Sequence, residues 1–212
     1  MRKSFLTNCP ALNAVGCLLN AALFLGCAPE DKMTPTDFYN KGIEHHEAKE
    51  FAAAIEAYGT AINHWSLDKS TSGTILANGY KLRGAARMGI RMDEIFLNKI
   101  ILLEKSEAGP DRERLQEDSA FRLAVADFTH AIALDNWGHG DPRIQLYSLR
   151  AMAYYCLGDF EHAAADYTAA LAIDPKCGEA LHNRGCVNLC LNETDTAEKD
   201  FTSAQVNGVQ QD

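Results

Sequence analysis

The amino-acid sequence predicts an all-α protein built as a solenoid of short helical hairpins. Ala-rich segments place apolar residues three or four positions apart, and no segment alternates with the period of two that strands require. A pattern of small and aromatic residues also returns after 34 positions. Together these observations predict about four helix-turn-helix repeats that stack in sequence order.

The most regular stretch is the 34 residues from Ile144 to Cys177. In its first half, Tyr147, Ala151 and Tyr154 share one face of a predicted helix. A Gly-Asp pair follows, which supplies a left-handed helix stop and then an N-cap acceptor. The second half carries a similar face through Tyr167 and ends at an Asp-Pro pair, because proline cannot continue a helix. This pattern predicts a helical hairpin with small residues where the two helices cross.

The same pattern follows once more, over residues 178–211. Gly185 stands 34 positions after Ala151, and Phe201 stands 34 positions after Tyr167. This period, with these small and aromatic positions, resembles the tetratricopeptide-repeat (TPR) family. The resemblance implies a scaffold without enzymatic activity, in which the first helix of each repeat lines a concave groove that binds peptides.

An earlier repeat spans residues 35–68. Thr34 can cap its first helix, and Pro35 suits the first helical position. Gly42 and Tyr58 occupy the small and aromatic positions with the spacing seen from Ala151 to Tyr167. The sequence therefore predicts a complete hairpin here.

The repeat over residues 77–138 is interrupted by about 28 extra residues, 90–117. Gly84 takes its small position, and Phe128 takes its aromatic position beyond the insertion. Because the insertion itself has a helical pattern, we expect both helices of this repeat to be elongated into a projecting hairpin. Its apolar run, residues 100–103, requires a cover. Either the facing helix or a partner, including a second copy, would provide it.

No separate polar capping helix follows the last repeat, although solenoids need a polar outer face at their ends. Either the last helix has a polar outer face, or the C-terminal end packs on another chain. Self-association through this repeat or through the 90–117 hairpin therefore remains open.

The first 26 residues predict a signal peptide of the lipoprotein type. Two basic residues precede a largely apolar run that is short for a membrane-spanning helix, and Cys27 follows a sequence resembling a lipobox, with Phe24 where Leu is usual. We expect cleavage before Cys27, lipidation of its thiol, and a tether over residues 27–34. The protein would then be exported and held at the bacterial cell envelope, facing the periplasm. An ordinary secretory signal or a single uncleaved anchor are the alternatives.

The net charge of the chain limits which classes of partner we expect. Cleavage would remove two of the 20 basic residues and none of the 29 acidic ones, which leaves a formal charge of −11. This charge argues against nucleic acid and against direct binding to anionic lipid, so contact with a membrane would come from the lipid anchor only. A mean hydropathy of −0.22 excludes a multi-span membrane protein. The expected partners are other proteins.

The sequence predicts no enzyme, no cofactor and no metal site. It lacks the common nucleotide-binding, zinc-protease and serine-hydrolase motifs. The run from Glu44 to Glu47 contains two histidines, but adjacent helical residues point about 100° apart and cannot converge on one ion. We expect the cysteines of the repeats to be buried free thiols, although export would permit disulfides. These cysteines are Cys156, Cys177, Cys186 and Cys190.

Arginine and aspartate occur together in the repeats. In three repeats an Arg precedes the small position and an Asp precedes the second-helix aromatic, whereas the first repeat has Lys41 and Ala57 there. This joint presence predicts structural ion pairs across the helix-helix seam. The residues are Arg83, Arg150 and Arg184, with Asp127, Asp166 and Asp200.

The resemblance also places a peptide-binding groove on the first helices. Lys81 is its only fixed positive charge, so we do not expect the carboxylate clamp of chaperone-binding TPRs. Its Met and Tyr residues favour an amphipathic helix or an extended apolar segment as the partner. A chaperone-like accessory subunit of an envelope enzyme or assembly is the alternative function. The groove residues would be Tyr39, Ile43, His46, Lys81, Ala85, Met88, Ser148, Met152, Tyr155, His182, Cys186 and Leu189.

Overall fold

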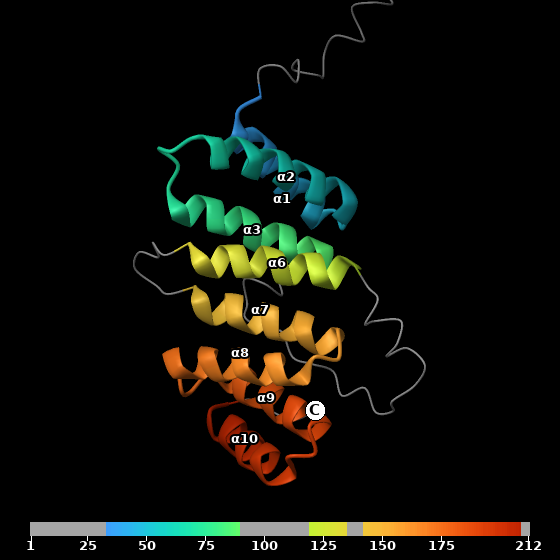
Figure 1. The fold of residues 1–212 in the computed structure, drawn as a ribbon, viewed down its shortest axis with the longest axis vertical. Helices are drawn as coiled ribbons and strands as arrows, with labels where there is room; N and C mark the ends of the chain where they lie inside the picture. The colour runs from blue at the N-terminus through green and yellow to red at the C-terminus, as the bar shows by residue number, and fades with distance from the viewer. Residues whose placement is uncertain (1–32, 90–118, 135–141, 209–212) are drawn as a thin grey trace, which may run out of the picture. The chain divides into compact units, whose positions relative to one another are not determined.

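The computed structural model describes residues 33–89, 119–134 and 142–208. The chain divides into two units, Met1–Thr34 and Pro35–Asp212, and all of the described helices lie in the second. Within the described ranges every regular element is an α-helix, eight in all, which confirms the predicted all-α class (Figure 1). The helices are α1 (Pro35–Glu47), α2 (Phe51–Leu67), α3 (Gly73–Arg87), α6 (Ser119–Ala133), α7 (Arg143–Cys156), α8 (Phe160–Ile173), α9 (Gly178–Cys190) and α10 (Thr194–Val206).

Each described helix packs against the next one in this order, from α1 on α2 through to α9 on α10. The pairs α1–α2, α3–α6, α7–α8 and α9–α10 form four helical hairpins, which we call repeats one to four. The order of contacts is that of a TPR solenoid, as the sequence predicts.

In repeats one, two and four the small position is a glycine that makes room for an aromatic ring, whereas repeat three has Ala151 there. A Cβ atom added at Gly42 would lie 2.6 Å from Tyr58 Cδ1, and one at Gly84 would lie 2.7 Å from Phe128 Cε1. At Gly185 the same atom would lie 2.6 Å from a Phe201 ring carbon. The 34-residue pattern therefore reports a close crossing of the two helices within a repeat.

Three of the hairpins turn on one residue in the left-handed conformation. The residue is Lys49 in repeat one, Gly158 in repeat three and Asn192 in repeat four, with φ of 62°, 74° and 62°. In each turn the next backbone N–H donates to a carbonyl in the last turn of the preceding helix, for example Asp159 to Tyr154 at 2.9 Å. This bond satisfies a carbonyl that the helix end would leave without a partner.

Repeat two departs from the prediction at the end of its first helix. The prediction that this helix is elongated is wrong, because α3 ends at Arg87 and Gly89 has a φ of 67°. The Met88 N–H donates to carbonyls of the last turn, which closes the helix. Measured from the small position, α3 even ends two residues earlier than α1. The predicted hairpin of residues 90–117 lies outside the described residues.

The outward faces of the first and last described helices are polar. On α7, the residues that pack toward repeat two are buried and apolar: Leu146, Leu149 and Ala153. The equivalent residues of α1 are exposed and polar: Asp37, Asn40 and Glu44. The outward face of α10 is also polar and exposed, through Asp195, Glu198, Lys199 and Thr202. Of the two alternatives for the C-terminal end, the structure therefore has the polar outer face.

Candidate functional site

The predicted groove residues lie on the first helices, but several of them are buried. The His46 side chain is 1% exposed; its Nδ1 lies 3.4 Å from the Tyr58 hydroxyl, and its ring meets Phe51 edge-on at 5.5 Å. His46 is thus part of the core, and the prediction that it faces a partner is wrong. The Ala85 and Cys186 side chains are buried as well.

Lys81 is also buried, although the sequence predicts that it faces the groove. Its side chain is 7% exposed, and its ammonium lies 3.5 Å from the Gln145 amide oxygen of α7. Burial lowers the pKa of the Lys81 ammonium, because the charged form is poorly solvated there. Lys81 therefore lies in the α3–α7 contact rather than presenting an open positive charge.

The remaining predicted groove residues are half-buried or exposed. Tyr155 packs against Phe160 at 5.5 Å, as His46 packs against Phe51 in repeat one. In repeat four, Thr194 stands where the other repeats have this phenylalanine, and Leu189 is 43% exposed. The open part of the surface is therefore apolar and lies on α7 and α9. The half-buried set is Tyr39, Ile43, Met88, Ser148, Met152, Tyr155 and His182.

The four cysteines of the described residues are free thiols, but only Cys186 is buried. The Cys190 thiol is exposed beside the Tyr155 hydroxyl, and burial raises the pKa of Tyr155 to about 12. Cys186 Sγ lies 3.7 Å from His182 Nε2. These two residues are one helical turn apart on α9, so helix geometry explains their proximity, and the thiol is closed to a substrate.

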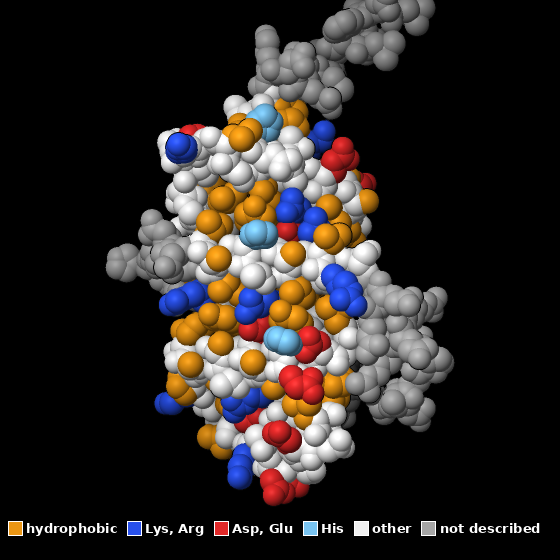
Figure 2. Space-filling model, viewed as in Figure 1, with side chains coloured by type: hydrophobic (Ala, Val, Ile, Leu, Met, Phe, Trp, Pro, Cys, Tyr) orange, Lys and Arg blue, Asp and Glu red, His pale blue; other side chains and the backbone are white. Residues whose placement is uncertain are grey.

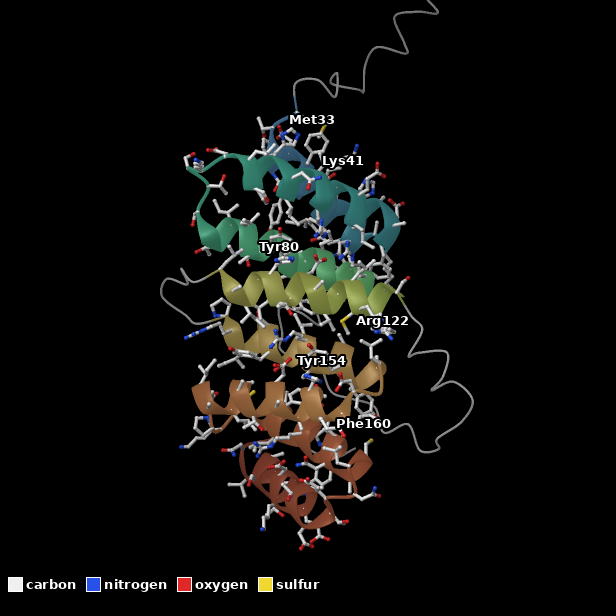
Figure 3. All side chains as sticks on the ribbon, viewed as in Figure 1. Met33, Lys41, Tyr80, Arg122, Tyr154 and Phe160 are labelled. Atoms are coloured by element: carbon white, nitrogen blue, oxygen red, sulfur yellow. The ribbon has the colours of Figure 1, made fainter. Side chains whose placement is uncertain are left out.

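The predicted Arg and Asp residues meet across the helix-helix seam within repeats two, three and four. Arg150 donates from Nε and Nη2 to the two carboxylate oxygens of Asp166, both at 2.7 Å. Arg184 makes the same bidentate contact with Asp200, at 2.9 and 2.6 Å. Such fork-to-fork contacts fix the relative position of the two side chains. In Figure 3, Tyr154 marks the α7–α8 seam, where its ring stacks on His162.

The third guanidinium nitrogen reaches the preceding repeat. Arg150 Nη1 donates to the Thr129 hydroxyl of α6 at 3.1 Å, and Arg184 Nη1 donates to the Thr168 hydroxyl of α8 at 3.2 Å. One arginine thus links three helices. Sequence comparison finds the Asp partner but misses this threonine, although both threonines directly follow the aromatic position.

Repeat two has a different seam. Arg83 donates to both oxygens of Asp127, at 3.0 and 2.6 Å, and Arg87 Nη1 donates to one of the same oxygens at 2.7 Å. Arg87 also donates to the Leu123 carbonyl at 2.9 Å. Two guanidinium groups therefore share one buried carboxylate. Burial lowers the pKa of Arg87, and the neighbouring charge of Arg83 adds to this effect.

Neither a metal centre nor a membrane span is found in the part of the chain that the structure describes. No group of three His, Cys, Asp or Glu side chains there could hold a metal ion. In the Glu44–Glu47 run, His45 contacts Glu50 at 2.6 Å. None of the described helices is long and apolar enough to cross a membrane. Cys27 and the rest of the predicted leader lie outside the described residues.

Comparison with known proteins identifies the repeat and the fold. Residues 144–177 match the family model of the tetratricopeptide repeat. The crystal structure of MamA superposes with a TM-score of 0.57 and 18% identity, over 91% of this chain and 83% of that one. Two further matches have TM-scores below 0.5. They are the second TPR of Spaghetti (RPAP3) bound to HSP90 peptide SRMEEVD (24% identity, 47% and 84% coverage, TM-score 0.39) and the TPR2AB domain of yeast Sti1 in complex with pHSP90 (20%, 84% and 79%, 0.37).

Proposed function

Because the chain is a tetratricopeptide-repeat protein, we propose that it is a scaffold without enzymatic activity that holds a partner protein against its first helices. The observation that carries this proposal is a partly exposed apolar surface on α7 and α9, where Leu189 is 43% exposed and Met152 and Tyr155 are half-buried. Methionine and tyrosine adapt to apolar side chains of varied shape. The fitting partner is an amphipathic helix or an extended apolar segment.

We further propose that an N-terminal lipid on Cys27 tethers this scaffold to the bacterial cell envelope on the periplasmic side. The support is the leader sequence, together with a formal charge of −11 that disfavours direct contact with anionic lipid. The intact mass of the full chain purified from membranes tests this proposal. A mass that corresponds to cleavage before Cys27 plus acyl chains is expected, and an unmodified N-terminus at Met1 would contradict it.

The partner surface is tested by pull-down of the full chain from solubilised membranes. Leu189→Lys places a charge on the partly exposed apolar surface, and we expect it to lose a partner that wild type retains in stoichiometric amount. Leu67→Lys is the matched control, since Leu67 is 84% exposed on α2 and belongs to no predicted groove position. Equal retention by both variants would exclude this surface. Many weakly held clients in place of one partner would favour the chaperone-like alternative.

The 90–117 insertion remains a separate prediction for the binding site. Replacing it with a short turn in the full chain separates the two possibilities. Loss of the partner with this variant, but not with Leu189→Lys, would assign binding to the insertion.

A further inference from the structure

The junction between repeats one and two lacks a hydrogen-bond acceptor that the later junctions have. Thr129 and Thr168 accept from the Nη1 atoms of Arg150 and Arg184, and each also donates to the carbonyl four residues earlier at 2.8 Å. The equivalent residue of repeat one is Gly59. A Cβ atom added there would meet a single atom within 4 Å, Arg83 Nη1 at 3.6 Å. A notch therefore replaces the threonine.

Arg83 faces this notch with a donor group. Its Nε and Nη2 atoms bond to Asp127, as in the other seams. For Nη1, no acceptor exists among the residues that the structure describes, in contrast to Arg150 and Arg184. The Arg83 side chain is 17% exposed, and its Nη1 atom is not among the buried polar atoms without a partner, so water can accept this bond. An outside group gains free energy here only if it accepts the bond better than water does, as a charged acceptor can.

The surroundings carry surplus positive charge. Asp127 is shared by Arg83 and Arg87, whereas Asp166 and Asp200 each pair with one arginine. With α2 included, which carries Gly59, the helices at this junction hold two acidic residues, Glu56 and Asp127. Arg83, Arg87 and Arg122 outnumber these two, and Lys81 points to the other side of α3. This surplus favours an anion over a neutral acceptor such as water.

A flat aromatic surface borders the notch. The Arg83 guanidinium lies over the Tyr80 ring, 5.3 Å from its centroid, and Tyr80 stacks on His130 at 5.2 Å (Figure 3). Figure 2 shows basic side chains, an acidic one and a histidine grouped over α3 and α6, with apolar side chains beside them. On α3, residues two positions apart point about 200° apart, so Arg83 lies opposite the groove residues Lys81 and Ala85.

We propose that the notch formed by Gly59 and Arg83, with Tyr80 at its edge and Arg87 sharing Asp127 beside it, binds a carboxylate side chain of a partner protein. The carboxylate would accept from Arg83 Nη1 and balance the surplus charge of the Arg83–Asp127–Arg87 group. This site is separate from the first-helix surface and does not depend on the function proposed for it.

The test uses two short peptides with blocked ends, identical except that one carries a single Glu and the other a Gln. Binding to the full chain is followed by NMR of the arginine Nε–H signals at low salt. We expect the Glu peptide to shift the Arg83 signal, and the Gln peptide to bind at least about tenfold more weakly. Equal affinity for both peptides, or no shift, would overturn the proposal.

Gly59→Thr supplies the missing hydroxyl inside the protein. It should abolish the binding of the Glu peptide while thermal unfolding shows a fold at least as stable as wild type, so loss of binding cannot be ascribed to unfolding. Gly59→Ala adds no acceptor but places a methyl group 3.6 Å from Arg83 Nη1, so it should weaken binding less than Gly59→Thr does. Thr168→Gly opens an equivalent notch at Arg184 without a second arginine, and should bind the peptide more weakly than the natural notch. Unchanged binding by Gly59→Thr would contradict the proposed site.

Discussion

The junction between repeats one and two and the junction between repeats three and four are joined by different forces. At the later junction, Arg184 connects Asp200 to Thr168 of the preceding repeat. At the earlier one, the side chains of Ile62 and Trp65 close on Gly79, where an added Cβ atom would lie 3.0 Å from Ile62 Cγ1 and 3.3 Å from Trp65 Cζ3. Neighbouring repeats are thus held together by directional hydrogen bonds at the later junction and by close apolar packing at the earlier one.

This difference determines which substitutions each junction tolerates. A bidentate ion pair costs desolvation, so its presence adds little net stability, but removal of one member leaves a buried charge. Apolar packing has no such asymmetry and responds mainly to volume. The later repeats should therefore be sensitive to loss of charge as well as to added atoms, whereas repeat one, which lacks the ion pair, should be sensitive to added atoms alone.

The largest expected effect is that of Arg150→Ala. It leaves the Asp166 carboxylate, only 8% exposed, without its guanidinium partner, and should lower the free energy of unfolding by about 3 kcal/mol. Chemical denaturation followed by circular dichroism measures the change. Lys41→Ala is the control, because Lys41 holds the same position in repeat one, is exposed, and should change stability by less than about 0.5 kcal/mol. An Arg150→Ala protein as stable as wild type would refute the structural role of the pair.

A smaller effect on stability is expected when a methyl group is added at a glycine of repeat one. Gly42→Ala places a methyl group 2.6 Å from the fully buried Tyr58 ring, which must shift, and should lower the free energy of unfolding by about 1–2 kcal/mol. Gly59→Ala adds the same methyl group, which meets only Arg83 Nη1 at an ordinary contact distance of 3.6 Å, and the better helix propensity of alanine should raise the free energy of unfolding by up to about 1 kcal/mol. If thermal unfolding showed that both variants are stabilised, or that both are destabilised, the space around each glycine would not determine the stability of this repeat.

Much of the fold could be predicted because the repeat pattern reports contacts within one hairpin. The spacing from Gly42 to Tyr58 reflects a ring packed on a helix crossing, and the joint presence of Arg150 and Asp166 reflects an ion pair. Both partners lie in the same repeat, so internal comparison finds them. Contacts between repeats were missed, since the threonines that accept from Arg150 and Arg184 belong to the preceding repeat.

The surface was harder to predict than the core. Helical periodicity places His46, Tyr155 and Leu189 at one position, yet they differ in exposure because an aromatic residue five positions later covers the first two. The end of α3 was also predictable in principle, because Gly89 supplies the left-handed residue that ends a helix. The helical pattern of the insertion predicts a longer helix, but the left-handed conformation of Gly89 ends α3 before the insertion begins.

The smallest expected effect concerns the turns within repeats, where repeat one again differs from repeat three. Lys49 and Gly158 both take the left-handed conformation, but only lysine has a Cβ atom that makes it unfavourable. Lys49→Gly should therefore raise the free energy of unfolding by about 0.5 kcal/mol. The strain energy removed from the folded backbone exceeds the entropic cost of ordering a more flexible glycine on folding. Gly158→Ala should lower it by about 1 kcal/mol. Thermal unfolding at matched protein concentration measures both changes, and a destabilised Lys49→Gly protein would mean that contacts of the lysine side chain outweigh its backbone conformation.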